Sequence, residues 1–244
     1  MNKIILDDEL INLEITNDEE IFLEEESLKE KVINIRVKKN NDVIINEIKN
    51  KNSNNVYNYY LEENASLIVN KFYNTEIVNE NDNAFLEGKK SKFDINISCI
   101  SKNAHEYKFN IYHNNEETIS NTKIHGITLK DEKILIENNG YIKNGSINSN
   151  LNQDNKIITM FKNNSIIKPN LFIDEFNSYA SHGAYIGKFE EEKLFYLKSR
   201  GLNEKESNNL MIKGFLLSDL NIENKIKEKL NSEIIKELEV NYEL

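Results

Sequence analysis

Short stretches of β-branched residues recur along the middle of this chain, and each begins at an asparagine. These asparagines are Asn64, Asn83, Asn103, Asn121 and Asn139, so the intervals between them are 19, 20, 18 and 18 residues. A period near twenty, with no helical pattern between the strands, is typical of a chain that coils into stacked parallel strands, a β-helix. Asparagine suits the corners of such a coil because it tolerates left-handed backbone angles, and stacked asparagines can form ladders. From the spacing alone, a β-sandwich remains an equal alternative.

The segments on either side of this region are also predicted to be strands. Before residue 64, apolar and polar residues alternate over Leu10–Ile15, Val32–Val37 and Val43–Ile45, with the two-residue period of a half-buried strand. A helical turn or two is possible over Glu24–Lys31. The alternation continues after residue 122, where the one proline, Pro169, predicts the edge or the start of a strand.

The last quarter of the chain is predicted to be helical. Ser181–Ala184 resembles a turn, and two helical patterns follow it, separated by Arg200-Gly201. Asn203 and Glu206 have the spacing of a capping box at the start of the second pattern. A third pattern repeats apolar residues every four positions over 222–238 and should pack back onto this hairpin. The expected buried face of the second helix comprises Leu210, Met211, Gly214, Phe215 and Leu217.

Charge and composition exclude several classes of partner. The chain has 244 residues, of which 30% are charged, and its net charge of −10 offers no basic field to a nucleic-acid backbone. No apolar run approaches the roughly 20 residues that span a bilayer, and no signal-peptide layout opens the chain. The single cysteine excludes an internal disulfide and fits a reducing compartment. We therefore expect a soluble, cytoplasmic protein with neither nucleic acid nor membrane as its partner.

The usual motifs of catalysis are missing. The sequence has no phosphate-binding loop, no Cys-x-x-Cys or His-x-x-x-His pair, and no Gly-x-Ser-x-Gly. Cys99 shares the parity of the neighbouring isoleucines in an alternating strand, so we expect a buried structural cysteine rather than a reactive thiolate. His105 and His113 lie in polar stretches and are expected to be solvated, whereas His125 is expected to be structural. His182 is competent as an iron ligand when its imidazole is neutral.

The order of residues over Asn170–Leu217 is more specific than any of these patterns. The stretch SHGA…IGK…EEEKLFYLKSRGL…E…LMIKGFL closely resembles the C-terminal signature of the SufB/SufD family, scaffold proteins of iron–sulfur cluster assembly. The resemblance is weaker but still followable back to about Asn64. It implies a mainly β fold, a right-handed parallel β-helix over residues 1–180, followed by a small C-terminal α-helical domain over residues 181–244. It also implies a non-catalytic scaffold rather than an enzyme.

Two departures from the family pattern indicate the SufD type. SufB-type members present a cysteine some six residues before the counterpart of Pro169, and a glutamate directly after the motif histidine. Asn163 and Gly183 stand at these positions, and an amide and a glycine cannot replace a thiolate and a carboxylate at iron. The resemblance therefore implies a SufD-like chain, in which His182 is a transient ligand of iron or of a nascent cluster at the interface with a SufB-type paralogue.

The resemblance also implies a second partner, a SufC-type ABC ATPase that docks on the helical domain. ATP hydrolysis would belong to that partner, and the iron–sulfur cluster would be held only transiently, in the complex. Two alternatives remain open: a stand-alone SufB/SufD-type scaffold that forms homodimers and, less favoured, a β-helix carbohydrate-active protein. The expected partner-binding residues are Phe195, Tyr196, Arg200, Met211 and Phe215.

Overall fold

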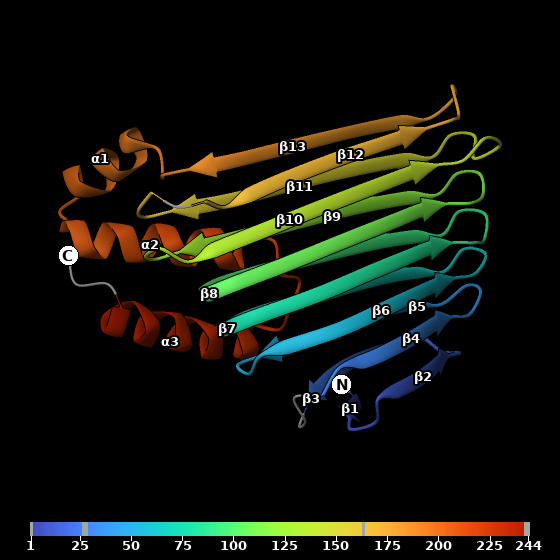
Figure 1. Ribbon diagram of the computed structural model, residues 1–244, viewed down its shortest axis with the longest axis horizontal. Helices are drawn as coiled ribbons and strands as arrows, with labels where there is room; N and C mark the ends of the chain where they lie inside the picture. The colour runs from blue at the N-terminus through green and yellow to red at the C-terminus, as the bar shows by residue number, and fades with distance from the viewer. Residues whose placement is uncertain (1, 26–28, 163, 242–244) are drawn as a thin grey trace.

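The computed structural model describes residues 2–25, 29–162 and 164–241, and within these ranges thirteen strands are followed by three helices (Figure 1). The strands are β1 (Asn2–Leu6), β2 (Leu10–Ile15), β3 (Glu19–Glu25), β4 (Lys31–Val37), β5 (Asp42–Lys49), β6 (Ser53–Leu61), β7 (Ser66–Leu86), β8 (Lys92–His113), β9 (Ile119–Thr128), β10 (Lys133–Ile142), β11 (Asn150–Thr159), β12 (Ile166–Ile173) and β13 (Tyr179–Gly187). The helices are α1 (Glu191–Ser199), α2 (Glu204–Leu217) and α3 (Asn224–Asn241).

Each coil of the chain contributes one strand to each of two sheets that face each other. One sheet runs β1-β3-β5-β7-β8-β9-β11-β13, and the other contains β2, β4, β6, the second halves of β7 and β8, β10 and β12. We call the first the helix-covered sheet and the second the exposed sheet. Every pairing between neighbouring strands is parallel. The chain is therefore a β-solenoid with C-terminal helices, which confirms the predicted parallel β-helix and excludes the β-sandwich (Figure 1).

The predicted strands before residue 64 are confirmed, but one predicted helical segment is not a helix where it can be followed. Leu10–Ile15 and Val32–Val37 lie in β2 and β4. Glu24 and Glu25 end β3 instead of starting a helical turn, and residues 26–28 of that expected turn lie outside the described residues.

The predicted period near twenty is wrong, because the coils are longer. On the exposed sheet, side-chain amides of successive coils donate Nδ2–H to Oδ1 at sequence steps of 22, 24, 25, 27, 29 and 31 residues. The coils therefore lengthen toward the C-terminus. Of the predicted corner residues, only Asn64 has a left-handed backbone, with a φ of 52°. The members of this asparagine ladder are Asn12, Asn34, Asn58, Asn83, Asn110, Asn139 and Asn170.

Charged side chains are buried inside the solenoid, beside a core of isoleucine, leucine and tyrosine. Lys71 Nζ lies 3.0 Å from a carboxylate oxygen of Glu80 and 2.7 Å from one of Asp82, and Lys49 Nζ lies 2.9 Å from Glu80. Burial opposes the ionisation of Glu80, but the attraction of Lys49 and Lys71 outweighs it and lowers the pKa of Glu80 to about 2. Burial raises the pKa of Asp82. Because each buried charge has an opposite charge beside it, the cluster is compatible with an interior site.

Helices α2 and α3 pack on the outer surface of the helix-covered sheet. Ile212 and Leu216 of α2 and Leu230 of α3 form an apolar cluster with Phe72 and Ile100 of the strands. The predicted capping box is confirmed, since the Asn203 side chain accepts from the Glu206 N–H at 2.9 Å and the Glu206 carboxylate accepts from the Asn203 N–H at 2.8 Å. The predicted packing of the third helix is also confirmed, because its residues Leu230, Ile234 and Leu238 are buried in this cluster.

The expected buried face of α2 is wrong by part of a turn. The residues of α2 that are buried are Ser207, Asn208, Ile212 and Leu216, whereas Leu210 is exposed. The buried residues of α2 include two polar ones, Ser207 and Asn208, whose burial hydrophobicity alone could not predict.

Candidate functional site

The solenoid ends in two strands that each have a free edge. β12 pairs only with β10, and β13 pairs only with β11, among the described residues. Both strands form the upper rim of the molecule in Figure 1. Pro169, which lacks an N–H, lies within β12, at an edge, as predicted. Free edges offer unpaired backbone groups to another chain. The exposed apolar side chains at this open end are Ile166, Phe172, Ile173, Tyr179, Tyr185 and Ile186.

His182 lies in the middle of β13 and not in a turn, so that expectation for Ser181–Ala184 is wrong. Its Cα is paired with that of Gln153 in β11, and Gln153 points into the solenoid. Side chains at paired positions of parallel strands share a face, so His182 projects over the interior. It is exposed because no described coil lies above it. The strand β13 also extends past residue 180, the predicted boundary between the two domains.

The hairpin of α1 and α2 presents a second exposed apolar surface. Helix α1 has no buried residue, and its Phe195 and Tyr196 are 75% and 56% exposed. The Arg200 guanidinium lies 5.1 Å from the centre of the Tyr196 ring. Gly201, with a φ of 95°, makes the left-handed turn between the two helices. A shallow depression between the helices is lined by Glu190, Glu192, Lys193, Tyr196, Leu197, Leu210 and Met211.

The structure brings four of the five predicted docking residues to this hairpin surface, but not the fifth. Phe215 lies on the other side of α2, where its ring stacks on His125 at 4.3 Å and meets Phe189 edge-on at 5.9 Å. Its role in partner binding stays a prediction. His125 is buried against α2, as expected of a structural residue.

The remaining candidate residues lie inside the solenoid. Cys99 is buried as predicted, and burial raises the pKa of its thiol to about 12. The expectation that His105 and His113 are solvated is wrong, since both are fully buried. Each has hydrogen-bonding neighbours in the coil, and burial lowers the pKa of both imidazoles to about 4. The polar residues around them in the sequence line the interior instead of the surface, which local composition could not reveal.

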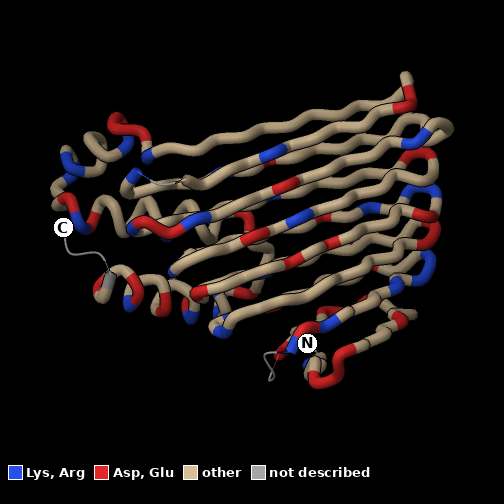
Figure 2. The backbone as a smooth tube through the Cα atoms, viewed as in Figure 1, with Lys and Arg blue, Asp and Glu red and all other residues tan. Residues whose placement is uncertain are grey.

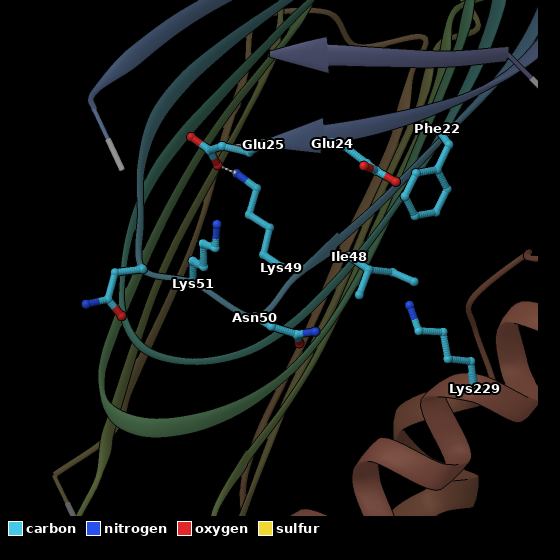
Figure 3. Close-up of a pocket in the computed structure, with 9 residues that line it drawn as sticks. Phe22, Glu24, Glu25, Ile48, Lys49, Asn50, Lys51 and Lys229 are labelled. Atoms are coloured by element: carbon cyan, nitrogen blue, oxygen red, sulfur yellow. Dashed lines mark ion pairs between the residues drawn. The ribbon is translucent and has the colours of Figure 1, made fainter. Parts of the chain in front are cut away.

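A pocket at the opposite end of the solenoid was not foreseen. Figure 3 shows it between β3, β5 and helix α3, with Phe22, Glu24, Lys49 and Lys229 among its lining residues. Glu25 and Lys49 form an ion pair of 3.1 Å inside it. In the sequence, the pair could have been found only from alternation, which places each of these two residues on the inward face of its strand. Throughout the ranges that the structure describes, no group of three or more His, Cys, Asp or Glu side chains could hold a metal ion.

The charges of the chain do not gather into one field. Figure 2 shows acidic and basic residues interspersed along the turns at one side of the coils and along the helices. None of the described helices is long and apolar enough to span a bilayer.

Fold and surfaces together define a class of protein: a β-solenoid with an open end and an appended helical hairpin. The family model for the SufBD core domain of SUF-system iron–sulfur cluster assembly matches residues 4–215, so the chain belongs to the SufBD family. This match confirms the family resemblance and leaves the carbohydrate-active alternative without support.

Similar proteins carry consistent names. The chain is 32% identical to the iron–sulfur cluster assembly protein SufD of Bacillus subtilis over 114 residues, which are 45% of this chain and 26% of that protein. It is 54% identical to a SufBD family protein of Pyrococcus horikoshii over 46 residues, 18% of this chain and 10% of that protein. It is 40% identical to SufD of Escherichia coli over 48 residues, 20% of this chain and 11% of that protein. The matched stretches thus span about a quarter or less of these relatives.

Proposed function

We propose that this chain is a SufD-like, non-catalytic scaffold subunit that works with a SufC-type ABC ATPase and a SufB-type paralogue. The observation that carries the proposal is the presence of two separate exposed surfaces, the open end of the solenoid and the hairpin of α1 and α2. A scaffold that joins two partners needs two such surfaces. The iron–sulfur cluster is the cargo of the complex, and this chain holds it only transiently.

The SufD-like assignment is supported by the residues beside the motif histidine. Gly183, where SufB-type members have a glutamate, lies in β13 next to His182, so no carboxylate follows the imidazole along the strand. Asn163, at the position of the SufB-type cysteine, lies outside the described residues. An imidazole alone is an incomplete site for iron or a cluster, so the remaining ligands would come from the paralogue.

The open end also supports the proposed contact with the paralogue. Among the described residues, no further strand stacks on β12: Asn170 donates to Asn139 at 2.8 Å, and Phe172 stacks on Tyr141 at 4.8 Å, each at the end of its row. The next strand of a partner could continue this stacking, and backbone pairing at a free edge gives such contacts their affinity. The same observation favours the second candidate, a homodimeric scaffold in which another copy of this chain covers the end.

The α1–α2 surface supports docking of the ATPase. An isolated helix of nine residues is marginal in water, and α1 has no buried side chain that would stabilise it. Aromatic side chains next to an arginine, such as Tyr196 beside Arg200, are typical anchors of protein interfaces. We infer that α1 and α2 receive the ATPase and that its nucleotide-driven motion passes through the helices to the solenoid.

The test is anaerobic cluster assembly by the reconstituted complex of this chain, the ATPase and the paralogue. His182→Ala is expected to reduce the yield of cluster at least tenfold while the three proteins still co-purify. Assembly that remains unchanged would exclude His182 as a ligand. Assembly by this chain and the ATPase without the paralogue would favour the homodimeric scaffold.

A further inference from the structure

Beneath His182, the interior of the solenoid is lined by amide side chains instead of hydrocarbon. Gln153, the partner of His182 in β11, is 3% exposed. Asn155 lies two residues further along the same strand, and Asn138 lies in β10, on the opposite sheet; both are fully buried. Burial of an amide costs free energy unless its polar atoms are hydrogen-bonded, so each of these atoms needs a partner.

The amide nitrogens all have acceptors. Gln153 Nε2 donates to the main-chain oxygens of Asn138, at 3.2 Å, and Asn170, at 3.4 Å. Asn138 Nδ2 donates to Asn155 Oδ1 at 3.2 Å, and Asn155 Nδ2 donates to the main-chain oxygen of Gly183 at 3.3 Å. These bonds fix which way each amide points, because an NH2 group and not a carbonyl must face a carbonyl oxygen.

Two buried oxygens are left over. Gln153 Oε1 and Asn138 Oδ1 have no hydrogen-bond donor among the described residues. A buried acceptor without a donor is uncommon in proteins and calls for an explanation. Two side chains with a donor lie in register with Gln153 and on its face: the Thr122 hydroxyl of β9 and the His182 imidazole of β13. Of the two, only the imidazole belongs to the exposed edge strand.

The surroundings of Gln153 hold its side chain in this position. Gly140 lies across the coil, and a Cβ there would lie 2.4 Å from Leu151 and 3.2 Å from Gln153 Nε2. The absence of a side chain at residue 140 therefore leaves the space that Gln153 occupies. The charged residues of β11, Asp154 and Lys156, pair with each other at 2.6 Å and alternate with Gln153, so they face away from the interior.

We propose that Gln153 is a positioning residue for His182: its buried Oε1 accepts one imidazole N–H, directly or through one water. The other ring nitrogen then presents its lone pair at the open end. Metal-binding histidines are commonly oriented in this way by an acceptor on the opposite nitrogen, which fixes the tautomer. The inference rests on the proposed role of His182 as a ligand, but it concerns the free chain and can be tested without a partner or a cluster.

The experiment is nitrogen NMR of the full chain labelled with ¹⁵N-histidine, at about pH 8.5, where imidazoles of ordinary pKa are uncharged. The ring-nitrogen shifts report which nitrogen carries the proton, and His182→Ala assigns the signal. Wild type is expected to show one dominant tautomer. Gln153→Leu, which removes the acceptor, is expected to bring the two tautomers to within threefold of each other.

Asn155→Leu is the matched control, because it removes another buried amide below His182, one whose oxygen and nitrogen both have hydrogen-bond partners. It is expected to leave the His182 tautomer unchanged. Should Gln153→Leu not fold, Gln153→Met is the second apolar variant. The same tautomer ratio in wild type and in the apolar variant would overturn the proposal, and so would an equal redistribution in Asn155→Leu. Failure here leaves the assembly test of His182→Ala to decide the proposed function separately.

Discussion

Two histidines inside the solenoid are held neutral by their surroundings. The ring nitrogens of His113 lie 2.7 Å from the hydroxyl oxygens of Thr118 and Ser120. Those of His105 lie 3.1 Å from the hydroxyl oxygens of Thr75 and Tyr107. Burial lowers the pKa of both imidazoles to about 4. In the unfolded chain a histidine takes up its proton near pH 6.5, so protonation below that pH favours unfolding.

We therefore expect the free energy of unfolding to fall as the pH falls from about 6.5 toward 4, because the unfolded chain binds more protons there. Each of the two histidines should contribute a loss of about 2 kcal/mol between pH 7.5 and pH 5. Urea unfolding of wild type and His113→Asn at both pH values measures the difference, which isolates the histidine from the buried carboxyl groups. An identical loss in wild type and His113→Asn would contradict the expectation.

At the scale of elements, side chains of the solenoid complete the C-terminal end of helix α2. The last carbonyl groups of a helix have no partner within it. Here Ser98 Oγ–H donates to the Leu216 oxygen at 2.5 Å, and His125 Nδ1–H donates to the Phe215 oxygen at 2.8 Å. Lys123 adds an ion pair of 2.8 Å to Asp219, just after the helix. These contacts fix the helical hairpin to the centre of the helix-covered sheet, where motion of a docked ATPase would have to pass.

His125→Ala removes the donor to Phe215 and the stacked ring, so we expect it to destabilise the attachment of α2 by about 1–2 kcal/mol. Hydrogen exchange should accelerate roughly tenfold in α2 and α3, since about 1.4 kcal/mol corresponds to a factor of ten. The strands of the exposed sheet should be unaffected. Lys108→Ala, on the outer face of that sheet, is the control. If hydrogen exchange in α2 were unchanged in His125→Ala, the contacts between His125 and Phe215 would not be what holds the helix on the sheet.

At the scale of the whole molecule, the two exposed surfaces belong to different elements, the edge strands and the helical hairpin. The open end lies along β12 and β13, whereas α1 lies beyond the end of β13 (Figure 1) and carries the exposed Phe195 and Tyr196. The open end is formed by strands of the solenoid, whereas the hairpin is attached through α2 to the helix-covered sheet, so each surface can bind its own partner.

Variants at the two surfaces should therefore separate the two associations. The double variant Phe195→Ala, Tyr196→Ala should weaken binding of the ATPase at least tenfold, because aromatic anchors carry much of the free energy of an interface. It should leave binding of the paralogue unchanged. Ile186→Lys, which places a charge at the open end, should do the reverse. Co-purification and calorimetry measure both, with Leu10→Ala, an exposed apolar residue far from either surface, as the control. Loss of both partners in either variant would contradict the separation.

Local patterns in the sequence determined where several strands and helices lie and which side chains face inward. Alternation of apolar and polar residues located β2 and β4, the spacing of Asn203 and Glu206 located the start of α2, and the parity of Cys99 predicted its burial. Each of these depends on residues close together in the chain, where strand and helix periods act. The order of residues around His182 identified the family and the candidate ligand.

The tertiary structure decided everything that depends on which coil stacks on which. The length of each coil sets the register between strands. Because that length is the sum of several strands and turns, the interval between successive asparagines gave too short a value for it. Only the register between coils buries His105 and His113 and puts Gln153 beneath His182, and only the bend within β7 places Lys71 beside Glu80. These residues lie in different elements or at opposite ends of a bend, and no local pattern links them. The physical reason is that contacts between coils are long-range, whereas sequence periodicity reports only the face on which a residue lies.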